Sequence, residues 1–504
     1  MRIIDCHVHA ISSGNYEEDN LWLVSRMLKQ GIEQMIVSDL GDGWLHFPDE
    51  KTLHEANRRI HKFAAASAGR VNHLVYINPQ LDNWRGEFEL YRSSAVGVKL
   101  WVSLKTAEDP SLEKSKQVLR AAAQYDLPVL IHTFERTCGN LPGEVGIDDV
   151  LELARAVPEC RILAAHTFGN WRLAIKRAAE FPENIRFDVS GIFPERTMIE
   201  RLTAVFGSKR IFYGTDAAGR SFGAMIKTIQ NSAVTDEEKA DILYRNAESF
   251  FKLRKPAEAV PVNCVSDGSI PVLEASEDHF CFAGRSPWWD HDISAADLAA
   301  EAERSGIKKL FAASLDAVSA ADKITANTVW RIEAEKYPAI HPLAAVDLRN
   351  MDRALEQLEN MQDFAGVWIS PYLHDYKLEA AAFEEFFKQC AKLKIQIWIN
   401  TALGDDRFRQ PSLVTRPVTA DEITAFCNAA PENIYTFQGV AAPELLMDLL
   451  PEYCFMEYSR FADGEIRRKA LSGNCRQLRR GSEYPFRCYR CVDEAIGNDA
   501  VLKK

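Results

Sequence analysis

The sequence has no excess of basic residues and no long apolar run. Its 60 Lys and Arg residues are outnumbered by 72 Asp and Glu residues, which gives a formal net charge of -12. A surface that binds nucleic-acid phosphates normally needs the opposite balance. No apolar stretch approaches the roughly 20 residues that cross a bilayer as a helix. We therefore expect neither nucleic acid nor a membrane as a partner.

The sequence also shows no secretory signal and no regular disulfide framework. The first residues, Met1 to His7, lack the basic and long apolar regions of a signal peptide. Eleven cysteines, an odd number spread over a long chain, are typical of free thiols. These features predict a cytoplasmic protein. Cys488 and Cys491, with Cys475 nearby, raise the alternative of a zinc knuckle, but no fourth ligand stands at a suitable spacing.

The length of 504 residues exceeds what one hydrophobic core supports, since single cores stop growing at roughly 250–300 residues. Half of the chain, about 250 residues, is the usual size of a (β/α)8 barrel. The hydrophobic fraction of 47% and the charged fraction of 26% are ordinary for globular proteins and argue against disorder or coiled coil. We expect two folded domains.

In the first half, short apolar runs alternate with amphipathic stretches. The runs predict eight strands, over residues 2–6, 34–38, 74–77, 97–101, 128–132, 161–165, 185–189 and 210–213. The stretches between them, such as 21–30, 113–125 and 147–156, carry apolar residues three and four apart, as helices do. This arithmetic predicts an α/β fold, a (β/α)8 barrel. An open doubly wound sheet is the alternative, but no Gly-rich phosphate loop is present.

The second half repeats the first. Ala95-Val96-Gly97-Val98 pairs with Phe364-Ala365-Gly366-Val367, and Leu130-Ile131-His132-Thr133 pairs with Trp398-Ile399-Asn400-Thr401. Because matches about 270 residues apart recur along the chain, we predict a duplication and two tandem TIM-like barrels. The predicted domains are a catalytic barrel over residues 1–253, a linker over 254–278 and a second barrel over 279–504.

The motif Asp5-Cys6-His7-Val8-His9 ends the first predicted strand. Alternate side chains of a strand share one face, so His7 and His9 point the same way. In a barrel that face is the interior, and the C-terminal ends of the strands are where active sites form. Two imidazoles placed in this way could bind one ion. A pair of hydrogen-bonded core histidines is the alternative reading of this motif taken alone.

Three further metal-competent residues follow predicted strands. His132, His166 and Asp216 stand at the C-terminal ends of strands five, six and eight by strand count. These ends meet on one face of a barrel, so we expect a site for one divalent metal ion there. Zn²⁺ suits imidazole and carboxylate ligands best, with Mn²⁺ and Fe²⁺ as alternatives.

With these residues the sequence resembles the amidohydrolase superfamily, specifically its amidohydrolase-related branch of metal-dependent hydrolases and decarboxylases. The resemblance covers about residues 1–253 and rests on His7-x-His9, Gly97-Val98-Lys99-Leu100, His132, His166-Thr167-Phe168-Gly169 and Gly214-Thr215-Asp216. It implies that His7, His9, His132 and Asp216 bind one metal ion, usually zinc. It also implies that His166 lies near the metal-bound water as an acid–base or electrophilic partner. In either role, Asp216 and His166 are the expected catalytic residues.

Lys99 has three possible roles. In some members of the superfamily, a lysine on the fourth strand becomes carboxylated and bridges two metals. In the branch resembled here, Gly-x-Lys-Leu occurs with a single metal, where Lys99 could contact a substrate anion or the metal hydroxide. A packing or ion-pair role is the third alternative.

Loop residues that follow the strands are candidates for binding the substrate. They are Trp101, Arg136, Asn170, Trp171 and Arg220. An arginine would suit a carboxylate group, because its guanidinium makes two parallel hydrogen bonds to it. The alternative for each of them is an ordinary surface side chain.

The second half has none of the expected ligands. The repeat places Phe282, Gly284, Trp368, Asn400, Gln438 and Glu483 at the positions of His7, His9, Lys99, His132, His166 and Asp216, with Cys281 at Cys6. Because no imidazole remains, we expect a degenerate, metal-free copy. We expect it to pair with the first barrel and to stabilise and shape its site. An independent ligand-binding domain is the alternative.

The expected function is metal-dependent hydrolysis of a small organic substrate by activated water. The alternative is non-oxidative decarboxylation of an unsaturated or aromatic carboxylic acid, which needs carboxylate clamps and releases CO₂. A non-catalytic metal or metabolite sensor is a second alternative. A homo-oligomer is compatible with this reading.

Overall fold

The structure is a computed structural model that describes residues 1–12, 14–43, 47–217, 220, 222–256, 276–440, 446, 449–457, 459, 477–487 and 489. The chain divides into two units, Met1–Gly268 and Ser269–Lys504. This division falls within the predicted linker, of which residues 257–275 lie outside the described part. The predicted domain boundaries themselves therefore stay predictions.

The first unit is a nearly closed barrel of parallel strands, ordered as they follow in the chain from β1 to β8. The strands are β1 (Ile4–His9), β2 (Gln34–Ser38), β3 (Val71–Tyr76), β4 (Gly97–Leu100), β5 (Val129–Ile131), β6 (Ile162–Ala164), β7 (Ile185–Asp188) and β8 (Ile211–Phe212). All eight strands predicted from the apolar runs are confirmed, with ends that shift by a few residues.

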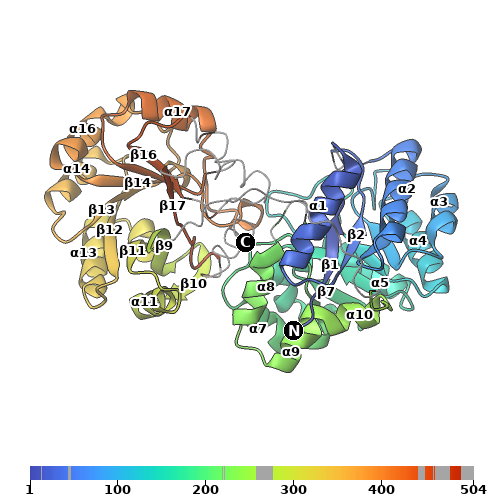
Figure 1. Ribbon diagram of the computed structural model, residues 1–504. Coiled ribbons are helices and arrows are strands. Elements are labelled where there is room, and N and C mark those ends of the chain that lie inside the picture. The colour runs from blue at the N-terminus through green and yellow to red at the C-terminus, as the bar shows by residue number, and fades with distance from the viewer. Residues whose placement is uncertain are drawn as a thin grey trace. The chain divides into compact units, whose positions relative to one another are not determined.

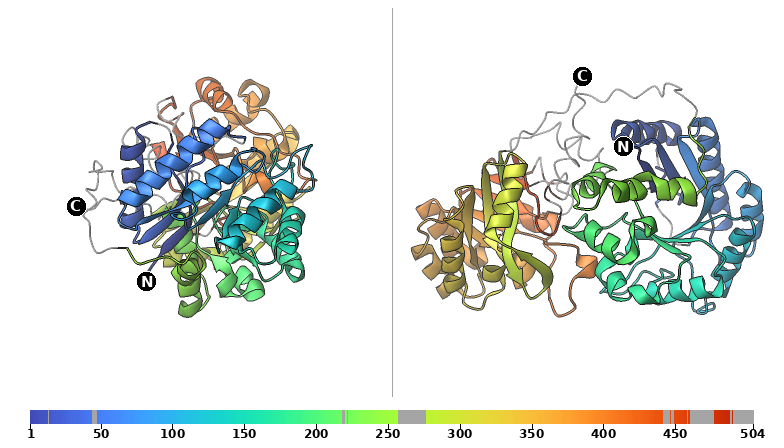
Figure 2. Two further views of the ribbon diagram at one scale, coloured as in Figure 1. Left: turned by 90° about the vertical axis from the view of Figure 1, so that its right-hand side faces the viewer. Right: turned by 90° about the horizontal axis from the view of Figure 1, so that it is seen from below.

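Helices surround these strands, as Figures 1 and 2 show for the blue-to-green part of the chain. They are α1 (Tyr16–Lys29), α2 (Glu50–Ala66), α3 (Trp84–Tyr91), α4 (Glu113–Gln124), α5 (Ile147–Ala156), α6 (Trp171–Lys176), α7 (Met198–Phe206), α8 (Phe222–Asn231), α9 (Asp236–Ala240) and α10 (Asn246–Phe250). Shorter helical segments are η1 (Ala165–Phe168), η2 (Ala178–Glu180), η3 (Ser208–Arg210) and η4 (Asp241–Arg245).

Alternation along the strands builds two apolar layers. On β4 and β5, Val98, Leu100, Val129 and Ile131 belong to the large core shared with the helices. Leu130, on the opposite face, belongs to a smaller cluster that fills the barrel interior. The other members of that interior cluster include Ile4, Cys6, Ile36, Leu74, Leu163, Phe212, Phe250 and Phe251.

A β-bulge in β1 determines which side chains enter the barrel. Asp5 pairs with Met35, but the next pair joins Val8 to Val37, so β1 has one extra residue at this point. Without the bulge, strict alternation after Ile4 and Cys6 would turn His7 outward. The bulge therefore allows His7 and His9 to face inward even though Cys6 also does.

The second unit is a curled sheet in the order β10-β9-β11-β12-β13-β14-β15-β16-β17, parallel except for the β9–β10 hairpin. Its strands are β9 (Glu277–Ser286), β10 (Trp289–Ile293), β11 (Lys309–Ser314), β12 (Ile340–Val346), β13 (Gly366–Ile369), β14 (Gln396–Asn400), β15 (Tyr435–Gln438), β16 (Cys454–Glu457) and β17 (Leu478–Arg479). The prediction of a second TIM-like domain is confirmed.

Its helices are α11 (Ala295–Arg304), α12 (Leu315–Ser319), α13 (Lys323–Ala334), α14 (Met351–Glu359), α15 (Pro371–His374), α16 (Glu384–Leu393) and α17 (Ala420–Ala429), with the short segments η5 (Ala381–Phe383) and η6 (Asp406–Phe408). The yellow-to-red ribbon in Figure 1 shows helices on the outer face of this sheet.

Every helix among the described residues is too short or too polar to cross a lipid bilayer. The seven described cysteines that the structure assigns are free thiols, and all except Cys138 are buried. Cys475, Cys488 and Cys491, considered above as zinc ligands, lie outside the described residues.

Candidate metal centre

Five of the predicted site residues gather at the C-terminal end of the first barrel. His7 and His9 come from β1, His132 directly follows β5, His166 lies in η1 after β6, and Asp216 follows β8. All four imidazoles are at most 7% exposed. The order of the strands thus brings together side chains that are more than 200 positions apart in the chain.

His7, His9 and Asp216 form one group of potential ligand atoms that lie within 4.8 Å of one another. Nε2 of His9 lies 3.1 Å from Oδ1 of Asp216, and Nε2 of His7 lies 3.8 Å from the same oxygen. The two imidazole rings meet edge to face at a centroid distance of 5.0 Å. Three of the four predicted metal ligands are therefore adjacent, in a buried position that suits a divalent metal ion.

His166 lies against this group, and His132 lies one step farther out. The His166 ring stacks on His7 at a centroid distance of 5.1 Å. Nε2 of His166 lies 3.2 Å from Nδ1 of His132. A second group of potential ligands joins His7 and His166 with Asp188, while His132 is in neither group.

Each imidazole is held by a protein group through one ring nitrogen. Nδ1 of His7 contacts Oδ2 of Asp188 at 3.0 Å, and Nδ1 of His9 contacts Oγ of Ser38 at 2.9 Å. Nε2 of His132 contacts Oε1 of Glu144 at 2.7 Å, and Nδ1 of His166 contacts the carbonyl oxygen of Ser190 at 3.0 Å. Metal-binding histidines are typically held in this way, because the contact fixes the tautomer and the orientation of the ring.

The acceptors in these contacts determine which ring nitrogen of each histidine carries the proton and which keeps a lone pair. Glu144 is ionised, since its contacts with His132 and Arg136 outweigh burial and lower its pKa to about 2. It therefore accepts a hydrogen bond from Nε2–H of His132, as the Ser190 carbonyl does from Nδ1–H of His166. Nδ1 of His132 and Nε2 of His166 then face each other with their lone pairs. A bound cation or a shared proton would satisfy both nitrogens.

Burial keeps three of the imidazoles neutral. It lowers the pKa of His9 to about 3 and the pKa of His132 to about 4, and it lowers the pKa of His166 well below its usual value. Lys99 adds to the effect at His9 and His132 by charge repulsion. Neutral imidazole is the form that binds transition metals, so the site needs no deprotonation of these side chains at neutral pH.

The carboxylate of Asp216 is ionised. Burial alone would raise its pKa, but the hydrogen bond from His9 and the nearby imidazoles outweigh burial, so the pKa lies well below its usual value. The backbone of Asp216 is in the left-handed region with φ of 66°. Its amide donates to the carbonyl of His7 at 2.8 Å. This hydrogen bond is one of several that join β1 to the residues after β8, and it places Asp216 beside β1.

Lys99, on β4, is fully buried and points at the same group. Its Nζ donates to Nε2 of His7 at 2.8 Å. Burial lowers its pKa to about 8, while the charges of Asp216 and Asp188 act in the opposite direction. Lys99 therefore carries a positive charge at neutral pH and lies beside the predicted metal ligands.

Four residues that support the site were not singled out from the sequence. Asp188, at the end of β7, accepts from the backbone amides of His166 and Ser190 at 2.8 and 2.9 Å. Asp5 accepts from the amides of His7 and Thr215, both at 3.1 Å. The positions of Asp188 and Asp5 on predicted strands were a usable signal. Ser38, the last residue of the predicted strand 34–38, carried the same signal. Glu144 offered none, because only the folded chain brings it to His132.

The predicted substrate-binding residues are partly engaged in other contacts. Arg136 binds Glu144 through Nε and Nη2 at 2.8 and 3.1 Å. Asn170 caps α6 by accepting from the amide of Leu173. Trp101 is buried with its ring 6.1 Å from that of His132. Trp171 is buried in the core shared with the helices. Arg220 is partly exposed, and its neighbours 218, 219 and 221 lie outside the described residues.

The second barrel repeats the backbone of this site in a register that corrects the sequence comparison. Asp278 accepts from the amides of Phe280 and Ser482, both at 3.1 Å, as Asp5 does from His7 and Thr215. A bulge follows Asp278 as one follows Asp5. The equivalents of His7 and His9 are therefore Phe280 and Phe282, not Phe282 and Gly284. Aligning Cys6 with Cys281 therefore shifted the expected equivalents of His7 and His9 by two positions.

The predicted equivalent of His166 also shifts, from Gln438 to Gly439. The amide of Gly439 donates to Glu457 at 2.7 Å, as the amide of His166 donates to Asp188 at 2.8 Å. Both residues have left-handed backbones, with φ of 72° and 61°. A Cβ atom on Gly439 would lie 2.1 Å from the carbonyl oxygen of Ala402.

The corrected register leaves the conclusion on ligands unchanged. Trp368, Asn400 and Glu483 do stand where Lys99, His132 and Asp216 stand in the first barrel, as the strand pairing shows. Phe280, Phe282 and Trp368 form part of an apolar cluster. Among the described residues, both groups of potential metal ligands lie in the first barrel.

Comparisons with known proteins give one family and a set of distant structures. Residues 4–253 match the family model described as Amidohydrolase. The search of curated proteins found no significant match. One solved structure, a 2,6-dihydroxybenzoate decarboxylase from Rhizobium, is 17% identical in sequence. The match spans 50% of this chain and 99% of the decarboxylase chain, with a TM-score of 0.39.

Two further solved structures are similar over the same share of the chain. A 5-carboxyvanillate decarboxylase from Sphingomonas paucimobilis is 15% identical and covers 50% of this chain and 99% of its own, with a TM-score of 0.39. A 4-oxalomesaconate hydratase from Rhodopseudomonas palustris is 14% identical and covers 50% of this chain and 95% of its own, with a TM-score of 0.39. At these identities and TM-scores the structures do not bear on the reaction.

Proposed function

Because residues 4–253 belong to the amidohydrolase family, we propose that the first barrel is a metal-dependent hydrolase of a small organic substrate. One observation carries the proposal. The buried imidazoles of His7 and His9 lie beside the ionised carboxylate of Asp216 at the C-terminal end of the barrel, and those of His166 and His132 follow next to them. That end is where enzymes of this fold carry their active sites.

The proposed metal ligands are His7, His9, His132 and Asp216. Zn²⁺ fits this set, because three imidazoles and a carboxylate are donors that zinc prefers, with Mn²⁺ and Fe²⁺ as alternatives. His132 fits through Nδ1, since Glu144 already occupies its other nitrogen. When bound, such an ion would act as a Lewis acid and lower the pKa of a water molecule towards about 7.

The side chains around the ligands divide the remaining work. Asp216 is ionised, so a carboxylate oxygen can accept a proton from the attacking water and later release it to the leaving group. His166 offers an unprotonated Nε2 that can hold a proton at the same place. The ammonium of Lys99 can hold an anionic oxygen of the substrate, and Trp101 helps to exclude water.

Decarboxylation of an unsaturated or aromatic acid is the second candidate, and the non-catalytic sensor is the third. A decarboxylase needs a cation that clamps the carboxylate leaving the substrate. Arg136 binds Glu144 through Nε and Nη2, so the assay below separates the two reactions.

The test uses the full chain loaded with Zn²⁺. Lactones and amides are assayed by proton release in a pH-stat, and hydroxybenzoic acids by release of CO₂. We expect hydrolysis of at least one lactone or amide, reduced more than about 1,000-fold in Asp216→Asn. The matched control is Asp148→Asn, because the Asp148 side chain is 84% exposed on α5. CO₂ release without hydrolysis would favour the decarboxylase. Bound zinc without any turnover would favour the sensor.

A further inference from the structure

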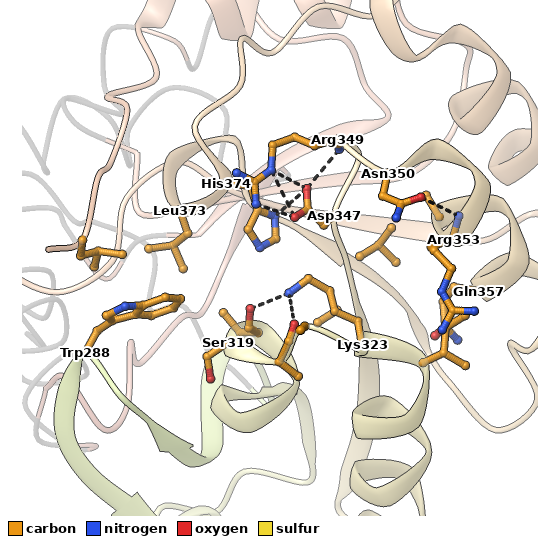
Figure 3. A pocket seen from close by; sticks show the side chains of 18 of the residues that line it. Trp288, Ser319, Lys323, Asp347, Arg349, Asn350, Arg353, Gln357, Leu373 and His374 are labelled. Atoms are coloured by element: carbon orange, nitrogen blue, oxygen red, sulfur yellow. Dashed lines mark hydrogen bonds and ion pairs between the residues drawn. The ribbon is translucent and has the colours of Figure 1, made fainter.

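The second barrel contains a cavity of about 480 Å³, drawn in Figure 3. It lies at the C-terminal ends of β11, β12 and β13, where α12 begins, where Asp347 follows β12, and where α15 begins. The volume falls within the range of small-molecule sites. This end of a barrel is also the one that carries functional sites.

One wall of the cavity is apolar. Trp288, in the turn between β9 and β10, lies on the same side as Leu373 in Figure 3. Val318, Leu413 and Val414 add to the apolar lining. Such a wall favours a ligand with a hydrocarbon or ring body over a bare inorganic ion.

The opposite wall carries three cationic side chains, Lys323, Arg349 and Arg353, and one carboxylate, Asp347. Arg353 pairs with Asp322 and Glu356 at 2.7 and 2.5 Å, which compensate its charge. Asp347 accepts hydrogen bonds from Nε and Nη2 of Arg349, at 3.0 and 2.7 Å. Within the described part of the chain, Nη1 of Arg349 has no hydrogen-bond partner, so two donors remain for a ligand.

Lys323 supplies a charge that the first barrel does not have at this place. Its Nζ donates to the carbonyls of Val318 and Ala320 at 2.7 and 3.2 Å. The side chain of Asn327 makes hydrogen bonds to the backbone amide and carbonyl of Ala345, and Asn57 does the same with Tyr76. The two asparagines are therefore equivalent in the two barrels. Counting back four residues from each asparagine, Lys323 corresponds to Leu53. A buried leucine of the first barrel is thus replaced by a cation in the second.

His374 is a buried residue whose ring has no hydrogen-bond partner among the described residues. The residue is 4% exposed, and both ring nitrogens are buried. Nδ1 lies 3.8 Å from Oδ1 of Asp347, which is beyond hydrogen-bond distance. Figure 3 shows its ring turned towards the space that Trp288, Leu373 and Lys323 surround. Leaving such a group unsatisfied costs free energy, which a ligand with polar atoms would recover.

From these observations we propose that this cavity binds a small organic carboxylate with an aromatic or other apolar body. The apolar wall holds the body, and Arg349 and His374 bind the carboxylate and its polar substituents. Lys323 adds a positive charge beside them. The proposal concerns the second barrel alone and does not depend on the reaction assigned to the first.

The test is calorimetric titration of the full chain with benzoate and with benzamide, its uncharged isostere. We expect benzoate to bind at least ten-fold more tightly than benzamide. Arg349→Met and His374→Phe should each weaken benzoate binding at least ten-fold. His374→Phe keeps an aromatic ring, slightly larger than imidazole, beside an open cavity and removes no hydrogen bond to a described residue, so we expect it to fold.

Two control variants locate the ligand. Arg331→Met also removes one arginine charge, but Arg331 lies on α13 and does not line the cavity. Its side chain pairs with Glu335 and Asp363. This variant should bind benzoate like the unaltered chain. Lys99→Met removes the buried cation of the first barrel and tests whether benzoate binds there instead. The proposal is overturned if benzoate does not bind, if benzamide binds equally well, or if Lys99→Met alone abolishes binding.

Discussion

Glu144 donates nothing to the metal centre, but it accepts a hydrogen bond from Nε2 of His132 at 2.7 Å. The same carboxylate binds Arg136 at 2.8 Å and accepts from the amide of Leu141 at 2.8 Å. It therefore fixes both the position of the imidazole and the nitrogen that carries its proton. The inward nitrogen of His132 is left unprotonated and able to bind a cation.

Glu144→Gln should weaken zinc binding by about 10–100-fold, the usual cost of removing a group that orients a metal-binding histidine. The amide no longer fixes the tautomer of His132. Competition with a chromogenic chelator measures the affinity. Glu152→Gln is the control, since the Glu152 side chain is 49% exposed on α5. Equal affinities in the two variants would contradict the role of Glu144.

His9→Ala should leave less zinc on the chain after dialysis, because Nε2 of His9 lies 3.1 Å from the carboxylate of Asp216 in the proposed ligand set. Elemental analysis should give about one zinc ion per unaltered chain. The control is His54→Ala, since the side chain of His54 is 47% exposed. Retention of a full equivalent of zinc by His9→Ala would argue against this ligand.

Lys99→Met should bind zinc at least as well as the unaltered chain and lose most of its activity. Nζ of Lys99 lies 2.8 Å from Nε2 of His7, so removal of the ammonium removes a positive charge beside the ion. Zinc content and turnover are measured on the same preparation. A carboxylated, bridging Lys99 predicts the opposite result, two metals in the unaltered chain and loss of metal in the variant.

The stability of the second barrel should depend on pH through His374. Burial lowers the pKa of His374 to about 4, below the value of about 6.5 in an unfolded chain. Between these values the unfolded state binds the proton more tightly, so stability is complete above about pH 6.5 and is lost as the pH falls towards 4. At pH 5 the loss is about 2 kcal/mol.

Urea unfolding of the unaltered chain and of His374→Phe at pH 7 and pH 5 measures this effect. On going from pH 7 to pH 5, the free energy of unfolding of the variant should rise by about 2 kcal/mol relative to that of the unaltered chain, since phenylalanine does not titrate. The comparison cancels the titration of all other groups. A difference that stays constant with pH would show that His374 is not buried in its neutral form.

Much of the fold follows from local patterns in the sequence. The apolar run over residues 34–38 and the amphipathic stretch over 147–156 coincide with β2 and α5. The first strand ends three residues later than predicted, at His9, because pairing with β2 resumes after the bulge, at Val8 and His9. A bulge depends on pairing with β2 and has no signature in the local sequence.

The site could be predicted as far as its residues lie at or just after the ends of strands. His7 and His9 lie in the last part of β1, while His132, His166 and Asp216 come one to four residues after β5, β6 and β8. Their meeting follows from barrel topology. Glu144 lies twelve residues beyond His132, in a loop whose path the sequence does not determine. The repeat was read in the wrong register at Cys281 because identity of one residue outweighed the hydrogen-bonding role of Asp278, which only the structure reveals.

Gly439 limits what the second barrel can hold at this position. Its main chain turns as that of His166 does, so the backbone there has the shape found in the first barrel. The carbonyl oxygen of Ala402, however, lies 2.1 Å from the place of a Cβ atom. Any residue larger than glycine, histidine included, would fit only after the segment around Ala402 had moved.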